Sequence, residues 1–187
     1  MKGLKYLIIA AIAILVAYYG YSPYQTVHAM KTAGENRDGE ALAEHIDFPS
    51  VRQSLKEQVN VKLEKMVNDD SAENPIGALG AALGGMLVDK LVDAYVTPAE
   101  LIQMMKGDTP EDVVADGITS DVTGRNGASQ NKQKPFQNAS YSYESLNRFA
   151  ATVKDDKSGN EISFILTRSG FANWKLTKVS SPWNEHR

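Results

Sequence analysis

The chain has 187 residues and no cysteine, and its 20 basic and 23 acidic side chains give a formal net charge of −3. This length suits a single domain with a small appendage and is too short for two large domains. The lack of cysteine excludes disulfides, thiolate metal sites and a cysteine nucleophile, and the acidic balance disfavours a basic surface for nucleic acid.

The N-terminal segment differs from the rest of the chain in charge and polarity. Lys2 and Lys5 are the only charged residues among the first 30, so removing their +2 from the total of −3 leaves −5 on the remainder. Residues 7–17 are uninterruptedly apolar, and at about 1.5 Å per residue the stretch 4–21 can cross a thin bilayer. Tyrosines flank this run, where lipid headgroups would favour them: Tyr6, Tyr18, Tyr19, Tyr21 and Tyr24. We therefore predict a retained transmembrane anchor over residues 1–21.

A cleaved signal peptide is the alternative interpretation, because a basic start and a short apolar core also fit one. Val27-His28-Ala29 supplies a weak cleavage motif, and cleavage would leave a soluble exported protein. Ser22-Pro23 instead predicts a capping residue and the first residue of a new helix, which would run through that motif to Gly34. The two lysines predict a cytoplasmic N-terminus, with residues 22–187 on the periplasmic side of the inner membrane.

Two further helices are predicted after this segment. Asp38 can cap a short helix that ends near Ile46, and Asp47-Phe48-Pro49 starts a third helix of about 20 residues. Its apolar residues recur every three or four positions: Val51, Leu55, Val59, Leu63 and Met66. At this junction, Asp47 and Arg52 predict a structural ion pair, with an anion pocket lined by Arg52 as the less favoured alternative.

The segment 75–88 is uncharged and contains four glycines. In a helix its small residues share one side: Gly77, Gly80, Ala81, Gly84 and Gly85. Helical glycines cost about 1 kcal/mol each, so this face predicts a close compensating contact. The contact lies within the domain core, against a partner or on the membrane surface, since 14 residues are too few to span a bilayer.

The remainder predicts an α+β domain. A capping box at Thr97 with Pro98 opens a helix to Gly107, so the helical part is 22–107, followed by a loop over 108–138. Alternating apolar residues and turn signals then predict an antiparallel β-meander over 139–182, packed on the helices.

Chemistry-bearing residues form no recognisable constellation. His28, His45 and His186 lack ligand spacing, and the pair Asp89 and Asp93 is typical of a solvated helix edge. No nucleophile elbow or phosphate-binding loop occurs. We therefore predict no catalytic residue, no metal, no cofactor and no enzyme activity.

Short motifs along the chain match a known pattern. They are Tyr21-Ser22-Pro23-Tyr24, Arg37-Asp38-Gly39, Asp47-Phe48-Pro49 with Arg52, and Trp174-Lys175-Leu176-Thr177, behind an apolar anchor. Together they resemble a bacterial family catalogued as domain of unknown function 2939. The resemblance implies an inner-membrane or exported protein of proteobacteria and assigns no activity. The order of helices before strands also resembles NTF2-like and cystatin-like folds, a likeness that carries no function.

These observations predict a membrane-anchored periplasmic protein that acts as a non-catalytic interaction or accessory module of a cell-envelope complex. Its expected partners are the membrane and a membrane or periplasmic protein, with no nucleic acid. A small-ligand-binding domain with an NTF2-like pocket between sheet and helices is the alternative. That alternative fails if Phe149, Phe164, Leu166 and Trp174 fill the space.

Overall fold

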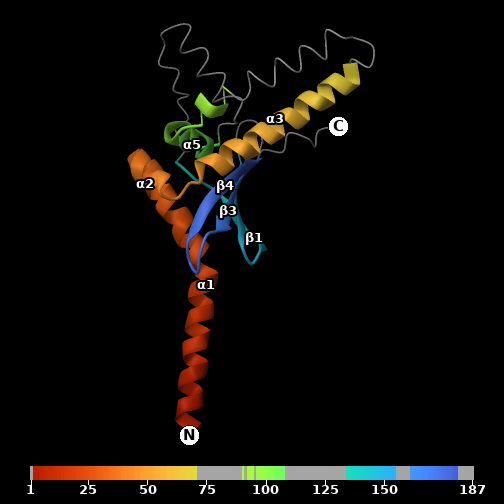
Figure 1. Cartoon of the computed structure of the whole chain (residues 1–187). Coiled ribbons are helices and arrows are strands. Elements are labelled where there is room, and N and C mark those ends of the chain that lie inside the picture. Colours follow the sequence, from red (N-terminus) through yellow and green to blue (C-terminus); the bar gives the residue numbers. More distant parts are fainter. Residues whose placement is uncertain are drawn as a thin grey trace.

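The computed structural model describes residues 2–70, 90, 92–94, 96–107, 134–154 and 161–180. Its helices are α1 (Lys2–Asn36), α2 (Gly39–Ala43), α3 (Phe48–Asp70) and α5 (Pro98–Met105). Its strands are β1 (Ser140–Ser145), β2 (Arg148–Lys154), β3 (Glu161–Arg168) and β4 (Trp174–Ser180). The strands form one antiparallel sheet in the order β1-β2-β3-β4, which confirms the predicted α+β fold with a C-terminal meander (Figure 1).

One face of the sheet carries the core. Alternate residues of β2 and β3 are almost completely buried there, because successive side chains of a strand point to opposite faces. In β4 the register shifts, so that Ile165 pairs with Lys178 and Leu166 with Leu176. Thr177 is thereby left over as a bulge, which lets Leu176 and Val179 both be buried although three positions separate them.

Helix α1 runs without interruption from Lys2 to Asn36 and contains Pro23. The prediction that a new helix starts at Ser22-Pro23 is therefore wrong. Proline has no N–H to bond the carbonyl of Tyr19, four residues earlier. The Ser22 hydroxyl donates to that Tyr19 carbonyl oxygen at 2.8 Å instead. The local side chain thus replaces the hydrogen bond that the proline removes, and the helix continues.

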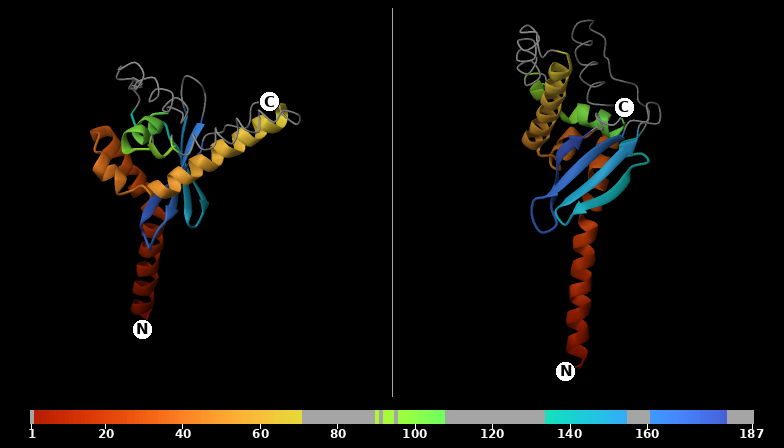
Figure 2. Two further views of the ribbon diagram at one scale, coloured as in Figure 1. Left: turned by 45° about the horizontal axis from the view of Figure 1, so that its top comes forward. Right: turned by 90° about the vertical axis from the view of Figure 1, so that its right-hand side faces the viewer.

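The two ends of α1 have different surroundings. Every residue from Gly3 to Tyr18 is exposed, and Figures 1 and 2 show this part as a stalk that projects from the domain. From Ser22 onward the helix packs into the domain, and Val27, Met30 and Ala33 are buried. By length and composition α1 is able to cross a membrane, a test that a signal sequence also passes.

The segment between α2 and α3 protects the edge strand β4. Asp38 caps α2 as predicted, since its carboxylate accepts from the Ala41 N–H at 3.0 Å. Ile46 then forms a parallel bridge with Leu176, whose N–H and carbonyl bond His45 and Asp47 at 2.9 Å each. An unpaired strand edge can recruit other chains, so this bridge covers part of an exposed backbone.

Candidate functional site

The place where α1 leaves the domain holds a buried hydrogen-bond relay. The Trp174 indole N–H donates to the Ser22 hydroxyl oxygen at 2.8 Å, and that hydroxyl donates to the Tyr19 carbonyl. Ser22 and Trp174 are each 2% exposed. A buried indole N–H needs an acceptor, so one serine satisfies both the indole and the carbonyl left free by Pro23. The relay joins the stalk to the last strand.

Arg168, at the end of β3, fastens both hairpin loops to this relay. Its guanidinium carbon lies 3.4 Å from the ring centroid of Tyr19 and 4.2 Å from that of Trp174, so the cation is stacked between the two rings. Its Nη1 donates to the Phe171 carbonyl at 2.6 Å, and its Nη2 to the Leu146 carbonyl at 3.3 Å. The loops β1–β2 and β3–β4 are thereby held against α1.

The tyrosines flanking the apolar run take two different positions. Tyr18 and Tyr21 are 47% and 60% exposed. Tyr24 is 37% exposed, stacks on Tyr21, and packs its ring edge-on against Phe149, with centroids 4.8 Å apart. The Tyr143 hydroxyl donates to the Gly20 carbonyl at 2.7 Å. Burial raises the pKa of Tyr143, although the positive charge of Arg168 opposes the shift. The phenol therefore stays protonated and remains a donor at neutral pH.

Of the predicted site residues, the small-residue face at 77–85 lies outside the described residues. Asp47 and Arg52 are both described, and each has its own contacts. The Asp47 carboxylate accepts from the Ser50 N–H at 3.3 Å and the Ser50 hydroxyl at 2.9 Å, and so caps the start of α3. Arg52 donates to the Val96 carbonyl at 3.1 Å and lies over the Phe48 ring. Within the described part of the chain, no ion pair joins Asp47 to Arg52.

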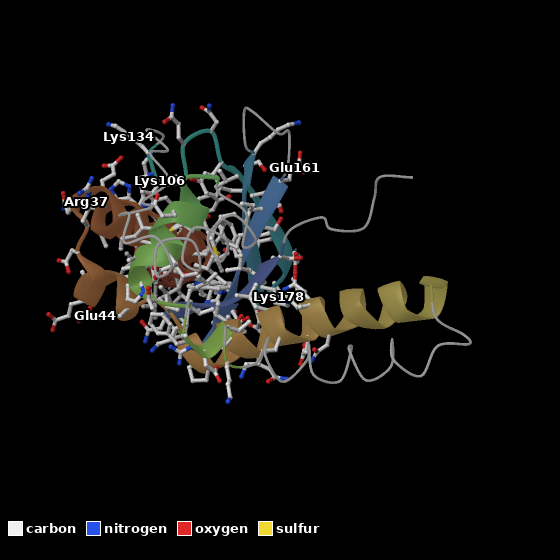
Figure 3. The ribbon with its side chains drawn as sticks, turned by 90° about the horizontal axis from the view of Figure 1, so that it is seen from above. Arg37, Glu44, Lys106, Lys134, Glu161 and Lys178 are labelled. Atoms are coloured by element: carbon white, nitrogen blue, oxygen red, sulfur yellow. The ribbon has the colours of Figure 1, made fainter. Side chains whose placement is uncertain are left out.

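A groove of about 500 Å³ separates the first turns of α3 from the outer face of the sheet. Both polar and apolar groups line it, from Pro49, Ser50, Gln53, Ser54, Glu57, Arg148, Ile165, Thr167, Thr177 and Lys178. The hydroxyls of Thr167 and Thr177 lie 2.7 Å apart, and Figure 3 shows Lys178 beside α3. Neither the groove nor the junction around Arg168 was predicted from the sequence. The sequence contained one indication of the junction, which was Ser22, a residue with a hydroxyl group directly before Pro23.

The space between the inner face of the sheet and the helices is filled. Phe149, Phe164 and Leu166 are completely buried and Trp174 is 2% exposed. Phe164 also contacts Phe136 edge-on, with ring centroids 5.2 Å apart. These aromatic and aliphatic side chains occupy the position in which an NTF2-like ligand pocket was considered. The expectation of a ligand pocket at this place does not agree with the packing.

Metal-ligating side chains do not gather in the described ranges, where no group of three His, Asp or Glu residues could hold an ion. His45 lies beside the bridge to β4, and burial lowers the pKa of its imidazole, with Glu44 opposing and Lys175 adding to the shift. His186 falls outside the described residues.

Comparison with known proteins gives one match. A family described as "Protein of unknown function (DUF2939)" matches residues 12–104, from the middle of the stalk to α5. This finding confirms the resemblance drawn from the sequence motifs. Searches of curated proteins and of solved structures found no match.

Proposed function

We propose that this chain, which belongs through residues 12–104 to the DUF2939 family of unknown function, is a single-pass membrane protein that holds a non-catalytic interaction domain outside the bilayer. The observation that carries the proposal is the continuity of α1. One helix has an apolar half exposed on all sides and a second half that forms part of the domain core. A helix that is apolar on all sides is stable in the hydrocarbon core of a bilayer, because its backbone hydrogen bonds are satisfied within the helix.

Retention of the anchor is supported by what cleavage would remove. The weak cleavage motif at 27–29 lies within α1, where Val27 is 3% exposed and neighbouring Met30 is fully buried. A cut after Ala29 would take Ser22 from the indole of Trp174 and Tyr24 from Phe149. Unpairing a buried donor alone costs about 1–3 kcal/mol. The mature domain would therefore lose part of its own core.

The proposed orientation follows from charge. Lys2 and Lys5 are the charged residues next to the apolar run, and basic residues stay on the cytoplasmic side. The domain would then lie on the periplasmic side of a bacterial inner membrane. An N-terminus of this kind, followed by an α+β domain, suits an accessory subunit that meets its partner at the membrane surface.

The groove between α3 and the outer face of the sheet is the proposed partner surface. It is open and lined by polar and charged side chains together with Pro49 and Ile165, whereas the inner face of the sheet is filled by the core. Non-obligate protein interfaces are about as apolar as the rest of the protein surface, and this mixed lining fits such an interface. A membrane or periplasmic protein is therefore the expected occupant.

Site-specific crosslinking in native membranes tests this role, and the absence of native cysteine makes single-cysteine labelling clean. A photocrosslinker would be attached at Gln53→Cys, in the groove, and at the control Glu35→Cys, an exposed position on α1. We expect a discrete protein adduct from position 53 that excess unlabelled protein competes away, and none from position 35. Recovery of the uncrosslinked monomer from both positions would contradict the interaction role.

A further inference from the structure

Each of the two hairpin tips next to the stalk exposes one large apolar side chain. Leu146, in the β1–β2 loop, is 76% exposed, and Phe171, in the β3–β4 loop, is 63% exposed. Their neighbours are uncharged from Ser145 to Asn147 and from Ser169 to Trp174. By contrast, charged side chains such as Arg37, Glu44 and Lys134 are seen when the domain is viewed from the end opposite the N-terminus (Figure 3). Each tip thus exposes one large apolar side chain, with the charged residues Glu144, Arg148 and Arg168 at the adjoining strand ends.

Both tips lie on the side of the domain from which the stalk emerges (Figures 1 and 2). Phe171 contacts the Tyr19 ring with centroids 5.8 Å apart. Along β1, Tyr141 contacts Tyr24 and Tyr143 bonds the Gly20 carbonyl, so the strand descends toward the N-terminal end of α1. Strand residues rise about 3.3 Å each and helix residues about 1.5 Å. Leu146, three residues past Tyr143, therefore lies beside the apolar run, on the N-terminal side of Gly20.

The length of the stalk sets where the bilayer surface must be. The exposed part of α1, Gly3 to Tyr18, is 16 residues long, which is about 24 Å at about 1.5 Å per residue. The hydrocarbon core is about 30 Å thick and needs about 20 residues. The exposed part of the stalk is therefore about 6 Å shorter than the hydrocarbon core, and its end at Tyr18 marks the headgroup level of a thin bilayer. Tyr19, where Arg168 and Phe171 hold the tips to the helix, is the next residue and lies at that level.

We infer that Leu146 and Phe171 form a second membrane contact, inserted into the headgroup layer of a phospholipid bilayer on the side where the domain lies. The inference rests on the proposed transmembrane anchor and adds to it. The shortfall of about 6 Å in the stalk is made up by the tips entering the interface. Arg168 bonds the carbonyls of both loops, so the tips are presented rigidly. The domain is then seated on the membrane and cannot swing freely from its anchor.

Depth-dependent fluorescence quenching tests the inference on the full chain. Single cysteines at Leu146→Cys, Phe171→Cys, Ile12→Cys and Glu35→Cys would carry an environment-sensitive dye in nanodiscs of phosphatidylcholine brominated on the acyl chain. Ile12 reports the anchor itself. Glu35 is exposed on the same helix, about 24 Å beyond Tyr19. We expect strong quenching at position 12, and quenching at 146 and 171 at least twofold greater than at 35.

The outcomes separate the two proposals. Quenching at position 12 with no difference between 146, 171 and 35 would overturn the second membrane contact and leave the anchor intact. Absence of quenching at position 12 would overturn the anchor and the membrane contact with it. Because positions 146 and 171 are exposed loop sites, cysteine there should leave folding unchanged, which the same circular dichroism spectrum for all four variants would verify.

Discussion

The two halves of α1 belong to one unbroken helix but have different surroundings. The half from Gly3 to Tyr18 exposes apolar side chains on every side, whereas the half from Ser22 buries one face that includes Val27 and Met30. Pro23 lies where the exposed half meets the buried half, and it does not interrupt the helix. The boundary between the exposed and buried halves is therefore set by packing against the sheet, through Ser22, Tyr19 and Trp174, and not by a break in secondary structure.

The largest expected effect comes from truncating the buried half. Met30 is fully buried, so Met30→Ala should lower the free energy of unfolding by about 2–5 kcal/mol through lost contacts and a cavity. The matched change in the exposed half, Ile12→Ala, should leave the unfolding of the domain unchanged, because Ile12 is 55% exposed. Thermal unfolding in nanodiscs, followed by near-ultraviolet circular dichroism, measures both. Equal losses would show that the halves are not distinct.

The relay at the boundary should give the next largest effect. Ser22→Ala removes the acceptor of the buried Trp174 N–H and the donor to the Tyr19 carbonyl. We expect a loss of about 1–3 kcal/mol in domain stability, measured by the same melts. Ser142→Ala, at an exposed serine of β1, is the control. If both variants melt alike, the relay does not stabilise the junction.

Arg168 should contribute less than the relay. Arg168→Lys keeps the charge but loses the planar group that lies between Tyr19 and Trp174 and bonds two loop carbonyls. A loss of about 1–2 kcal/mol is expected, with faster hydrogen exchange in the loops at 145–147 and 169–173. Arg148→Lys, at an exposed ion pair with Glu144, should leave both quantities unchanged. Unaltered exchange in the loops of Arg168→Lys would count against its role as their fastener.

The smallest expected effect is the change in stability with pH that the partly buried His45 contributes. Burial lowers the pKa of His45 from its usual value of 6.5. Below that value the unfolded chain therefore binds a proton that the folded chain binds less readily. Stability should fall as the pH drops through 6.5, and His45→Gln should reduce this dependence slightly. Melting temperatures of both proteins at pH 7.5 and 5.5 test this, and identical slopes would contradict it.

The fold was more predictable than the candidate site. Alternating apolar residues, as in Ile162, Phe164 and Leu166, and the capping residue Asp38 identified the meander and α2 directly, because these patterns depend on local geometry. The helix start expected at Ser22-Pro23 was wrong, since Trp174, 152 positions away, bonds the same serine. Arg168 gave no sequence signal, because its contacts with Tyr19 and Leu146 arise only when the sheet packs on α1. Patterns of neighbouring residues cannot predict such contacts, because the residues involved are far apart in the sequence.

Retention of the anchor is the central claim, and the intact mass of the protein extracted from membranes tests it most directly. We expect the mass of the full chain, 20.4 kDa, with Lys2 and the apolar stalk still attached. A mature protein lacking residues 1–29, cut after Ala29, would contradict it.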